Sequence, residues 1–223
     1  MTTVKINQED NFDELFDNIV CDNEVFIDVG GYNGDTVTKA LQINPNLSIL
    51  VIEPIKFLCD EMKHKFANNP NITIINKAAF NRKCSLIFNE YDGGFRGLST
   101  LQKTMTELRP KGMFTNHIAK YEVRADTIDN MLLNCNIDTI DYIKIDTEGS
   151  EEQVLQGFTK YHIGTRFHVE SHITNLENIL QTLLEMGVDI ETITVMRDGN
   201  IKEHVVGSVI GEFAKNGSEI IIR

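Results

Sequence analysis

An acidic residue and three glycines follow one apolar run near the start of the chain. In the stretch VFIDVGGYNGDT (25–36), Asp28 precedes Gly30, Gly31 and Gly34, and a helical pattern begins after them. Glycine tolerates turn angles that other residues resist, and it lets a ligand approach the backbone closely. The N–H groups at a helix start favour an anion, either a phosphate or a carboxylate. The stretch therefore predicts a ligand-binding turn, although it meets neither the GxGxxG spacing nor the Lys-Ser/Thr ending of a phosphate-binding loop.

A second acid, Glu53, ends the next apolar run in the stretch LVIEP. It lies about 20 residues beyond the glycines, where a carboxylate can accept hydrogen bonds from both hydroxyls of a ribose. Asp28 ends a buried strand, where an unpaired carboxylate is costly. The ammonium group of a ligand that carries an amino acid, reached directly or through the turn and water, would supply the partner that Asp28 needs.

Two further acids follow the apolar run at the start of IKIDTEGSE. Asp146 and Glu148 fall at a strand end, and ligands bind at that edge of a parallel sheet. Two nearby carboxylates repel each other unless a positive or proton-donating group lies between them. We therefore expect Asp146 and Glu148 to face a ligand, whereas we interpret Glu151 and Glu152 as first-turn residues favoured by the helix dipole.

The stretch FHVESH places His168, Glu170 and His172 at alternate positions of a strand, so that all three side chains point the same way. Such a cluster could orient a general base or, together with Asp146, hold a divalent metal. We interpret His168 as a core histidine and keep His172 as a candidate base. The sequence singles out no further metal ligands, so no metal site is predicted.

The elements that must position these residues alternate along the chain. Nearly continuous apolar runs at 25–29, 48–52, 72–75, 142–145 and 166–169 are typical of buried parallel strands. Helical patterns lie between them at 36–43, 55–66, 151–158 and 176–186. The alternation predicts an α/β fold with a Rossmann-like, doubly wound, mostly parallel sheet. Runs at 191–196, 201–206 and 219–222 predict antiparallel strands near the C-terminus.

A chain of 223 residues fits a single domain, predicted here to span 1–223. We expect a short acidic helix over about 1–22 to act as an N-terminal cap. The segment from about 89 to 120 does not fit the alternation of strand and helix patterns, and insertions of that length are often functional lids. This segment carries Tyr91, Phe95, Arg96 and His117, which suit stacking on a sugar and hydrogen bonding to it.

The composition excludes several classes of partner. With 33 Asp and Glu against 21 Lys and Arg, the net charge is -12, which repels phosphate backbones and anionic lipid, so no nucleic-acid partner is expected. No run approaches the roughly 20 apolar residues of a membrane span, and the N-terminus lacks a signal-peptide pattern. The four cysteines lie far apart without a metal-binding or disulfide pattern. We therefore expect a cytoplasmic protein.

Four stretches in order, FIDVGGYNGDT, LVIEP, NKAAF and DYIKIDTEGSEEQVLQG, resemble the FkbM family of S-adenosylmethionine-dependent methyltransferases over about 25–170. The resemblance implies a class I methyltransferase fold and S-adenosylmethionine as the cofactor. In this comparison the glycine turn would hold the methionine half, Glu53 the ribose, and the NKAAF turn (76–80) the adenine. The family often carries alanine at the position of Gly31. The implied cofactor-binding residues are Asp28, Gly30, Gly31, Tyr32, Gly34, Asp35, Thr36, Glu53, Pro54, Ala78, Ala79 and Asp146.

The same resemblance implies transfer of a methyl group to an oxygen acceptor, a sugar or polyol hydroxyl of a glycan, glycolipid or secondary metabolite. Such a transfer needs alignment and the removal of one proton, for which Asp146, Glu148 and His172 are the candidate bases. N-methylation, an idle cofactor-binding relative, an NAD-dependent sugar-modifying oxidoreductase and a non-catalytic interaction protein remain as alternatives. The sequence indicates neither the acceptor nor the oligomeric state.

Overall fold

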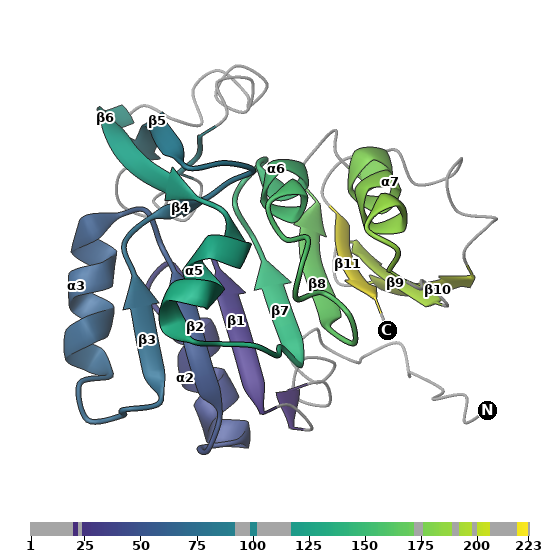
Figure 1. Ribbon diagram of the computed structural model, residues 1–223, viewed down its shortest axis with the longest axis horizontal. Coiled ribbons are helices and arrows are strands. Elements are labelled where there is room, and N and C mark those ends of the chain that lie inside the picture. The colour runs from purple at the N-terminus through teal and green to yellow at the C-terminus, as the bar shows by residue number, and fades with distance from the viewer. Residues whose placement is uncertain are drawn as a thin grey trace.

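The structure is a computed structural model that describes residues 20–21, 24–91, 99–101, 117–171, 176–188, 192–197, 200–205 and 218–222. Strands and helices alternate over most of its length (Figure 1). In chain order the elements are β1 (Val25–Val29), α2 (Asp35–Ile43), β2 (Ser48–Ile52), α3 (Lys56–Lys65), β3 (Ile72–Ile75), β4 (Ala78–Ala79), β5 (Cys84–Tyr91), β6 (His117–Asp126), α5 (Ile128–Cys135), β7 (Tyr142–Ile145), α6 (Glu151–Gln156), β8 (Arg166–Ser171), α7 (Leu176–Glu185), β9 (Thr192–Arg197), β10 (Asn200–Val205) and β11 (Ser218–Ile222).

Within the described residues, the main sheet has eight strands in the order β10-β9-β11-β8-β7-β1-β2-β3. The strands β3, β2, β1, β7 and β8 pair in parallel. At the other edge β11 runs antiparallel to both β8 and β9, and β10 runs antiparallel to β9. The predicted doubly wound sheet with antiparallel strands near the C-terminus is therefore confirmed. Chain order reverses between β1 and β7, and ligands bind beyond the carboxyl ends of strands at such a switch point.

Helices cover both faces of this sheet (Figure 1). One face packs against α5, α6 and α7 and includes Ile27, Val29, Ile143 and Ile145. The opposite face packs against α2 and α3 and includes Phe26. Successive side chains of a strand point to opposite faces, so burial on both sides explains the continuous apolar runs. Asp28 shares the face of Phe26 and is fully buried there, as a polar exception within an apolar strand.

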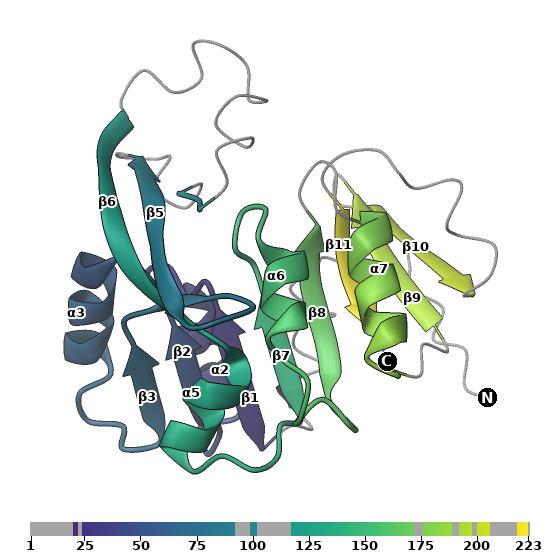
Figure 2. The same ribbon diagram turned by 45° about the horizontal axis from the view of Figure 1, so that its top comes forward.

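A second, three-stranded sheet has the order β4-β6-β5 and was not predicted from the sequence. In Figure 2 its long strands β5 and β6 rise beyond the carboxyl ends of β1, β2 and β3. The two ends of the predicted insertion belong to these strands, since β5 continues to Tyr91 and β6 begins at His117. Residues 92–98 and 102–116 of the predicted lid lie outside the described residues, as does the predicted N-terminal cap except for 20 and 21.

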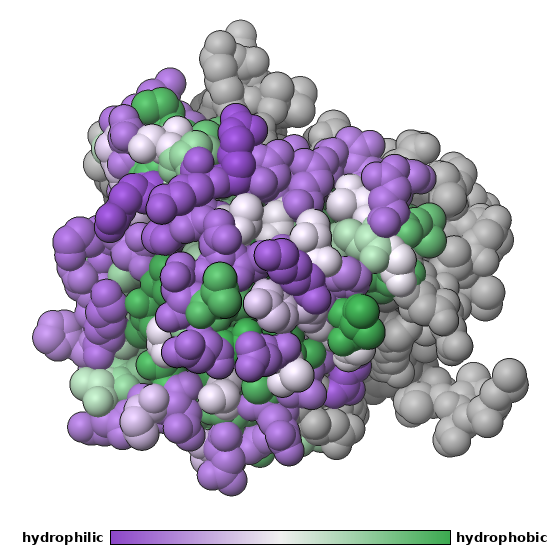
Figure 3. Space-filling view, in the orientation of Figure 1, coloured by the Kyte–Doolittle hydropathy of each residue, from purple (hydrophilic) through white to green (hydrophobic). Residues whose placement is uncertain are grey.

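The face seen in Figure 3 is mostly hydrophilic, and its hydrophobic residues appear in small separate groups. Among the described residues, no helix has both the length and the apolar character that crossing a membrane requires.

Candidate functional site

The glycine turn joins β1 to α2 and is held against the ends of two neighbouring strands. The N–H of Gly30 donates to the carbonyl of Ile52, at 2.9 Å, and Gly30 has a φ of +86°. A Cβ at Gly30 would lie 1.8 Å from the carbonyl oxygen of Asp146. Gly34, with a φ of +75°, would bring a Cβ within 2.8 Å of the Phe66 ring. The missing side chains therefore let the turn approach the ends of β7 and α3, while the approach of a ligand to the turn stays a prediction.

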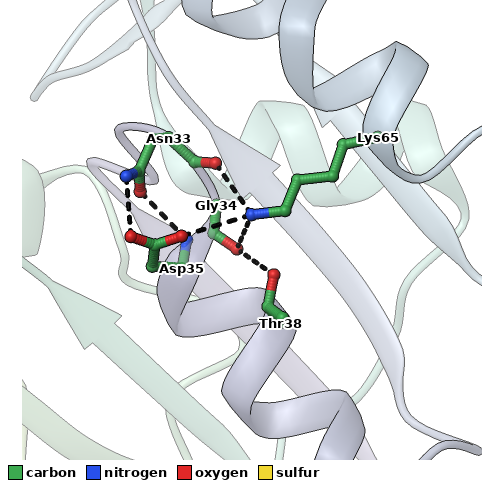
Figure 4. A network of polar contacts seen from close by, with 5 residues as sticks. All are labelled: Asn33, Gly34, Asp35, Thr38 and Lys65. Atoms are coloured by element: carbon green, nitrogen blue, oxygen red, sulfur yellow. Dashed lines mark hydrogen bonds and ion pairs between the residues drawn. The ribbon is translucent and has the colours of Figure 1, made fainter.

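A polar network fixes the start of α2 (Figure 4). Asn33 accepts a hydrogen bond from the backbone N–H of Asp35 at 3.0 Å and donates one to its carboxylate at 2.7 Å. The Lys65 ammonium lies 3.3 Å from the Asp35 carboxylate and 3.3 Å from the carbonyl of Gly34. The Thr38 hydroxyl donates to that carbonyl at 2.8 Å. The Asp35 side chain is 77% exposed, so it stabilises the helix start from the outside.

Glu53 ends β2 and is 4% exposed. One carboxylate oxygen accepts the N–H of Tyr32 at 3.0 Å, and the other accepts the N–H of Ile55 at 2.8 Å. Burial raises the pKa of Glu53 to about 8, against the lowering effect of these two hydrogen bonds. Each oxygen has a second lone pair, so the carboxyl group can still accept hydrogen bonds from two ligand hydroxyls.

Asn76 holds the strand end that carries Glu53. Its amide group donates to the carbonyl of Glu53 at 3.1 Å and to the carbonyl of Pro54 at 2.9 Å. The first residue of the NKAAF turn thus fixes the backbone on both sides of the Glu53–Pro54 bond. Ala78 and Ala79, from the same turn, form β4 and pair with β6.

Asp28 lies beneath the glycine turn and is fully buried. Neither of its carboxylate oxygens has a hydrogen-bond partner among the described residues. Burial raises the pKa of Asp28 to about 6, the charge of Lys144 lowers it, and that of Asp146 raises it. A buried carboxyl group without such a partner suits a ligand that brings a positive charge.

The loop after β7 is fixed from within by Glu151. One Glu151 carboxylate oxygen accepts the N–H of Thr147 at 3.0 Å, the Thr147 hydroxyl at 3.1 Å and the N–H of Gly149 at 2.9 Å. The backbone between them is unusual, because Glu148 has a φ of +56° and Gly149 a φ of +109°. Glu151 is fully buried, so it organises the loop and is more than a first-turn acid favoured by the helix dipole.

The small sheet fixes the same loop from outside. The buried hydroxyl of Thr100 donates to the carbonyl of Glu148 at 2.7 Å. Two backbone hydrogen bonds, of 2.9 and 3.0 Å, join Thr100 to Asn89 of β5. Asp146, at the start of the loop, accepts a hydrogen bond from the Lys144 ammonium at 2.9 Å. The backbone of the loop and the Asp146 side chain are therefore held by hydrogen bonds before any ligand arrives.

A cavity lies where these segments meet, at the carboxyl ends of β1, β2 and β7. It brings together eight of the predicted site residues, namely Gly30, Tyr32, Glu53, Pro54, Ala78, Ala79, Asp146 and Glu148. Its lining also includes residues that the sequence did not single out as site residues: Val29, Ile52, Ile55, Phe88, Ser99, Leu101 and Thr147. Five predicted residues lie outside the lining: Asp28, Gly31, Gly34, Asp35 and Thr36. His172 lies outside the described residues.

His168 is buried, and its Nδ1 lies 3.0 Å from the Tyr142 hydroxyl, which agrees with its interpretation as a core histidine. Within the described parts of the chain, no three His, Cys, Asp or Glu side chains gather in a way that could hold a metal. The alternative metal site of Asp146, Glu170 and His172 depends on a residue outside those parts. None of the four cysteines forms a disulfide.

The methyltransferase FkbM domain model matches residues 28–190 of the chain. A comparison with curated proteins finds no significant match. An uncharacterised protein from Listeria monocytogenes serotype 4b is similar in structure, with a TM-score of 0.51 and 10% identity over 96% of this chain and 67% of that one.

Two further solved structures have lower TM-scores. A precorrin-6Y C5,15-methyltransferase from Geobacter metallireducens has a TM-score of 0.46 and 12% identity over 99% of this chain and 90% of that one. A SAM-dependent O-methyltransferase from Thermotoga maritima has a TM-score of 0.47 and 12% identity over 98% of this chain and 67% of that one. At such identities a structural likeness concerns the fold alone.

Proposed function

Because this chain belongs to the FkbM family of S-adenosylmethionine-dependent methyltransferases, we propose that it methylates an oxygen acceptor, a sugar or polyol hydroxyl of a glycan, glycolipid or secondary metabolite. Family membership establishes the methyltransferase class and the cofactor, and it favours them over the NAD-dependent alternative. The oxygen acceptor is the proposed part. The observation that carries it is the cavity in which Glu53, Asp146 and Glu148 meet at the ends of neighbouring parallel strands.

The residues in and below this cavity fit the cofactor. Glu53 has carboxylate lone pairs available for two ribose hydroxyls, and the buried Asp28 suits an ammonium group. Ala78, Ala79 and Phe88 give the cavity an apolar wall suited to adenine. We therefore assign the ribose to Glu53, the methionine ammonium to Asp28 and the adenine to the wall beside β4 and β5.

When bound, the cofactor supplies an electrophilic methyl group, and the attacking hydroxyl must lose one proton. We propose that the Glu148 carboxylate accepts this proton. Asp146 is paired with Lys144, which stabilises its ionised form and makes it a weaker base. Asp146 is then the acid that faces the sulfonium side of the cofactor, while His172 stays a candidate base.

The test uses S-adenosylmethionine with a labelled methyl group, the purified protein and an extract of its host. We expect label in a carbohydrate-containing product, in an ether linkage that resists mild base. The Glu53→Ala variant should transfer far less label from the same extract. Label found only on amine nitrogen, or equal labelling without the protein, would overturn the proposed oxygen acceptor.

A further inference from the structure

Lys144 is a buried cation among acids. It is 9% exposed, and its ammonium lies 2.9 Å from an Asp146 carboxylate oxygen. In the sheet it is paired with Asp28 across β1 and β7, and with His168 across β7 and β8. Asp28, Lys144 and His168 thus form a row across three neighbouring strands, with the lysine between the acid and the buried histidine.

Besides Asp28 and Lys144, the charged groups near this row are Asp146 after β7, Glu170 in β8 and Glu53 after β2. Burial lowers the pKa of Lys144, but the charges of Asp146, Asp28 and Glu170 outweigh it and hold that pKa above its usual range. Lys144 therefore stays charged at neutral pH. The charges of Asp28 and Asp146 also raise the pKa of Glu53, which lies at the end of β2. His168 contributes its ring, whose Nδ1 contacts the Tyr142 hydroxyl.

The side chain of Lys144 reaches Asp146 and leaves Asp28 without a hydrogen bond. Its hydrogen bond goes to Asp146, while both oxygens of Asp28 lack such a partner among the described residues. Lys144 thus acts on Asp28 through its charge alone. A direct ion pair would occupy the Asp28 carboxylate, whereas a nearby charge favours its ionised form and leaves the oxygens available.

We propose that Lys144 is a positioning residue that holds the Asp146 side chain at the cavity and keeps the negative charge on Asp28 for the ammonium group of the cofactor. The inference rests on the proposed assignment of that ammonium group to Asp28. Replacing a buried ion pair by apolar residues is often neutral or stabilising, so stability alone does not require a lysine here. Without Lys144, two neighbouring acids would face each other with no counter-charge, and burial would then favour protonated Asp28.

The test measures the affinity of S-adenosylhomocysteine by calorimetry between about pH 5.5 and 8.5. A neighbouring opposite charge shifts a carboxyl group by about one pKa unit or more, which is a tenfold change in its ionisation constant. For Lys144→Met we expect affinity about eightfold below wild type near pH 5.5, about threefold below it near pH 6.5, and close to wild type near pH 8.5. Lys144→Arg should follow the wild type, and Asp28→Asn should bind weakly and keep only the pH dependence that comes from Glu53.

Lys144→Gln, which keeps a hydrogen-bond donor without the charge, should behave as Lys144→Met and replaces it if that variant does not fold. A loss of affinity that is equal at all pH values, or no loss at all, would overturn the inference.

A second readout needs no ligand. The carboxyl carbon of Asp28, followed by NMR and assigned with Asp28→Asn, should titrate about one pKa unit higher without Lys144. An unchanged titration overturns the inference, whereas a wild type that binds no S-adenosylhomocysteine at any pH overturns the proposed cofactor site instead.

Discussion

On the strand-end side the cavity is lined by the acids Glu53, Asp146 and Glu148, whereas on the small-sheet side it is lined by Ala78, Ala79 and Phe88, with Ser99 and Leu101 from the segment after β5. Glu53 is held by two hydrogen bonds from the backbone, and Asp146 is held by one from Lys144. The small-sheet side contributes mainly apolar contact and the hydrogen bond from Thr100 to the loop after β7. The difference indicates that the strand ends recognise charged and hydroxyl groups of the cofactor, while the small sheet encloses its flat apolar part.

The largest effect is expected on the strand-end side, at the proposed base. Glu148→Gln should lower turnover by about 10²–10⁴, as expected for a lost general base, while S-adenosylhomocysteine affinity stays within about threefold. The readouts are methyl transfer to the identified acceptor and calorimetry. Glu152→Gln, on the outer side of α6 with hydrogen bonds to Gln156 and Asn178, is the matched control. Unchanged turnover in Glu148→Gln would move the base to another residue, with His172 the next candidate.

The turn on the same side should tolerate no side chain at Gly30. Gly30→Ala adds a Cβ that would lie 1.8 Å from the Asp146 carbonyl oxygen, on a backbone with positive φ, so we expect a loss of about 3 kcal/mol in the free energy of unfolding. Gly164→Ala is the control, because it has a φ of +80° and no atom within 4 Å of its Cβ. That variant should lose only about 1 kcal/mol. Equal losses in urea unfolding would show that close packing against β7 does not matter.

The buried acids of the strand-end side should make the ligand-free protein less stable as pH rises. Unfolded carboxyl groups ionise near pH 4, but folded Asp28 and Glu53 ionise near 6 and 8, so the folded state binds more protons in that interval. Stability should therefore fall by several kcal/mol between about pH 4 and 8, and level off above. Urea unfolding at several pH values measures it. Glu53→Gln should flatten the slope, and an equally steep decline in that variant would contradict the buried-acid explanation.

The next effect distinguishes Glu53 from surface acids. Glu53→Ala should weaken S-adenosylhomocysteine binding by about 2 kcal/mol, roughly 30-fold, because two hydrogen bonds to ribose hydroxyls are lost. Glu61→Ala, an exposed acid on α3, should leave the affinity unchanged. Calorimetry on both folded variants decides the matter, and a normal affinity in Glu53→Ala would leave this acid with only a structural role.

The smallest effect is expected on the small-sheet side. Phe88→Leu keeps the wall apolar but removes the aromatic face, so we expect affinity for S-adenosylhomocysteine to fall by about 1 kcal/mol, roughly fivefold. Thermal unfolding of the variant controls for its place in the cluster with Ile55 and Val123. A loss as large as that of Glu53→Ala would erase the distinction between the two sides of the cavity.

The main sheet could be predicted from the sequence because its parallel strands are buried on both faces. Such strands appear as nearly continuous apolar runs, and the structure places β1, β2, β3 and β7 over the same residues. The acids that end these apolar runs could be predicted as site residues because a charged residue contrasts with the apolar run before it. Glu53, Asp146 and Glu148 stand out where an apolar run stops, and parallel topology brings such ends together.

The small sheet could not be predicted in the same way. Its strand β5 is buried on one face only, with Ile87 57% exposed, and its partner β6 begins at His117, far along the chain. The supporting roles of Asn76 and Glu151 were also hidden. Each depends on hydrogen bonds to backbone groups, which residue spacing does not reveal, and the pairing of Lys144 with Asp28 depends on the register between β1 and β7.

The most direct test of the proposed cofactor site is a crystal structure of the protein with S-adenosylhomocysteine. We expect the ribose hydroxyls within hydrogen-bond distance of the Glu53 carboxylate, the adenine beside Ala78, Ala79 and Phe88, and the ammonium group toward Asp28. A molecule of S-adenosylhomocysteine bound elsewhere, with Glu53 making only its hydrogen bonds to Tyr32 and Ile55, would contradict the assignment of this cavity to the cofactor.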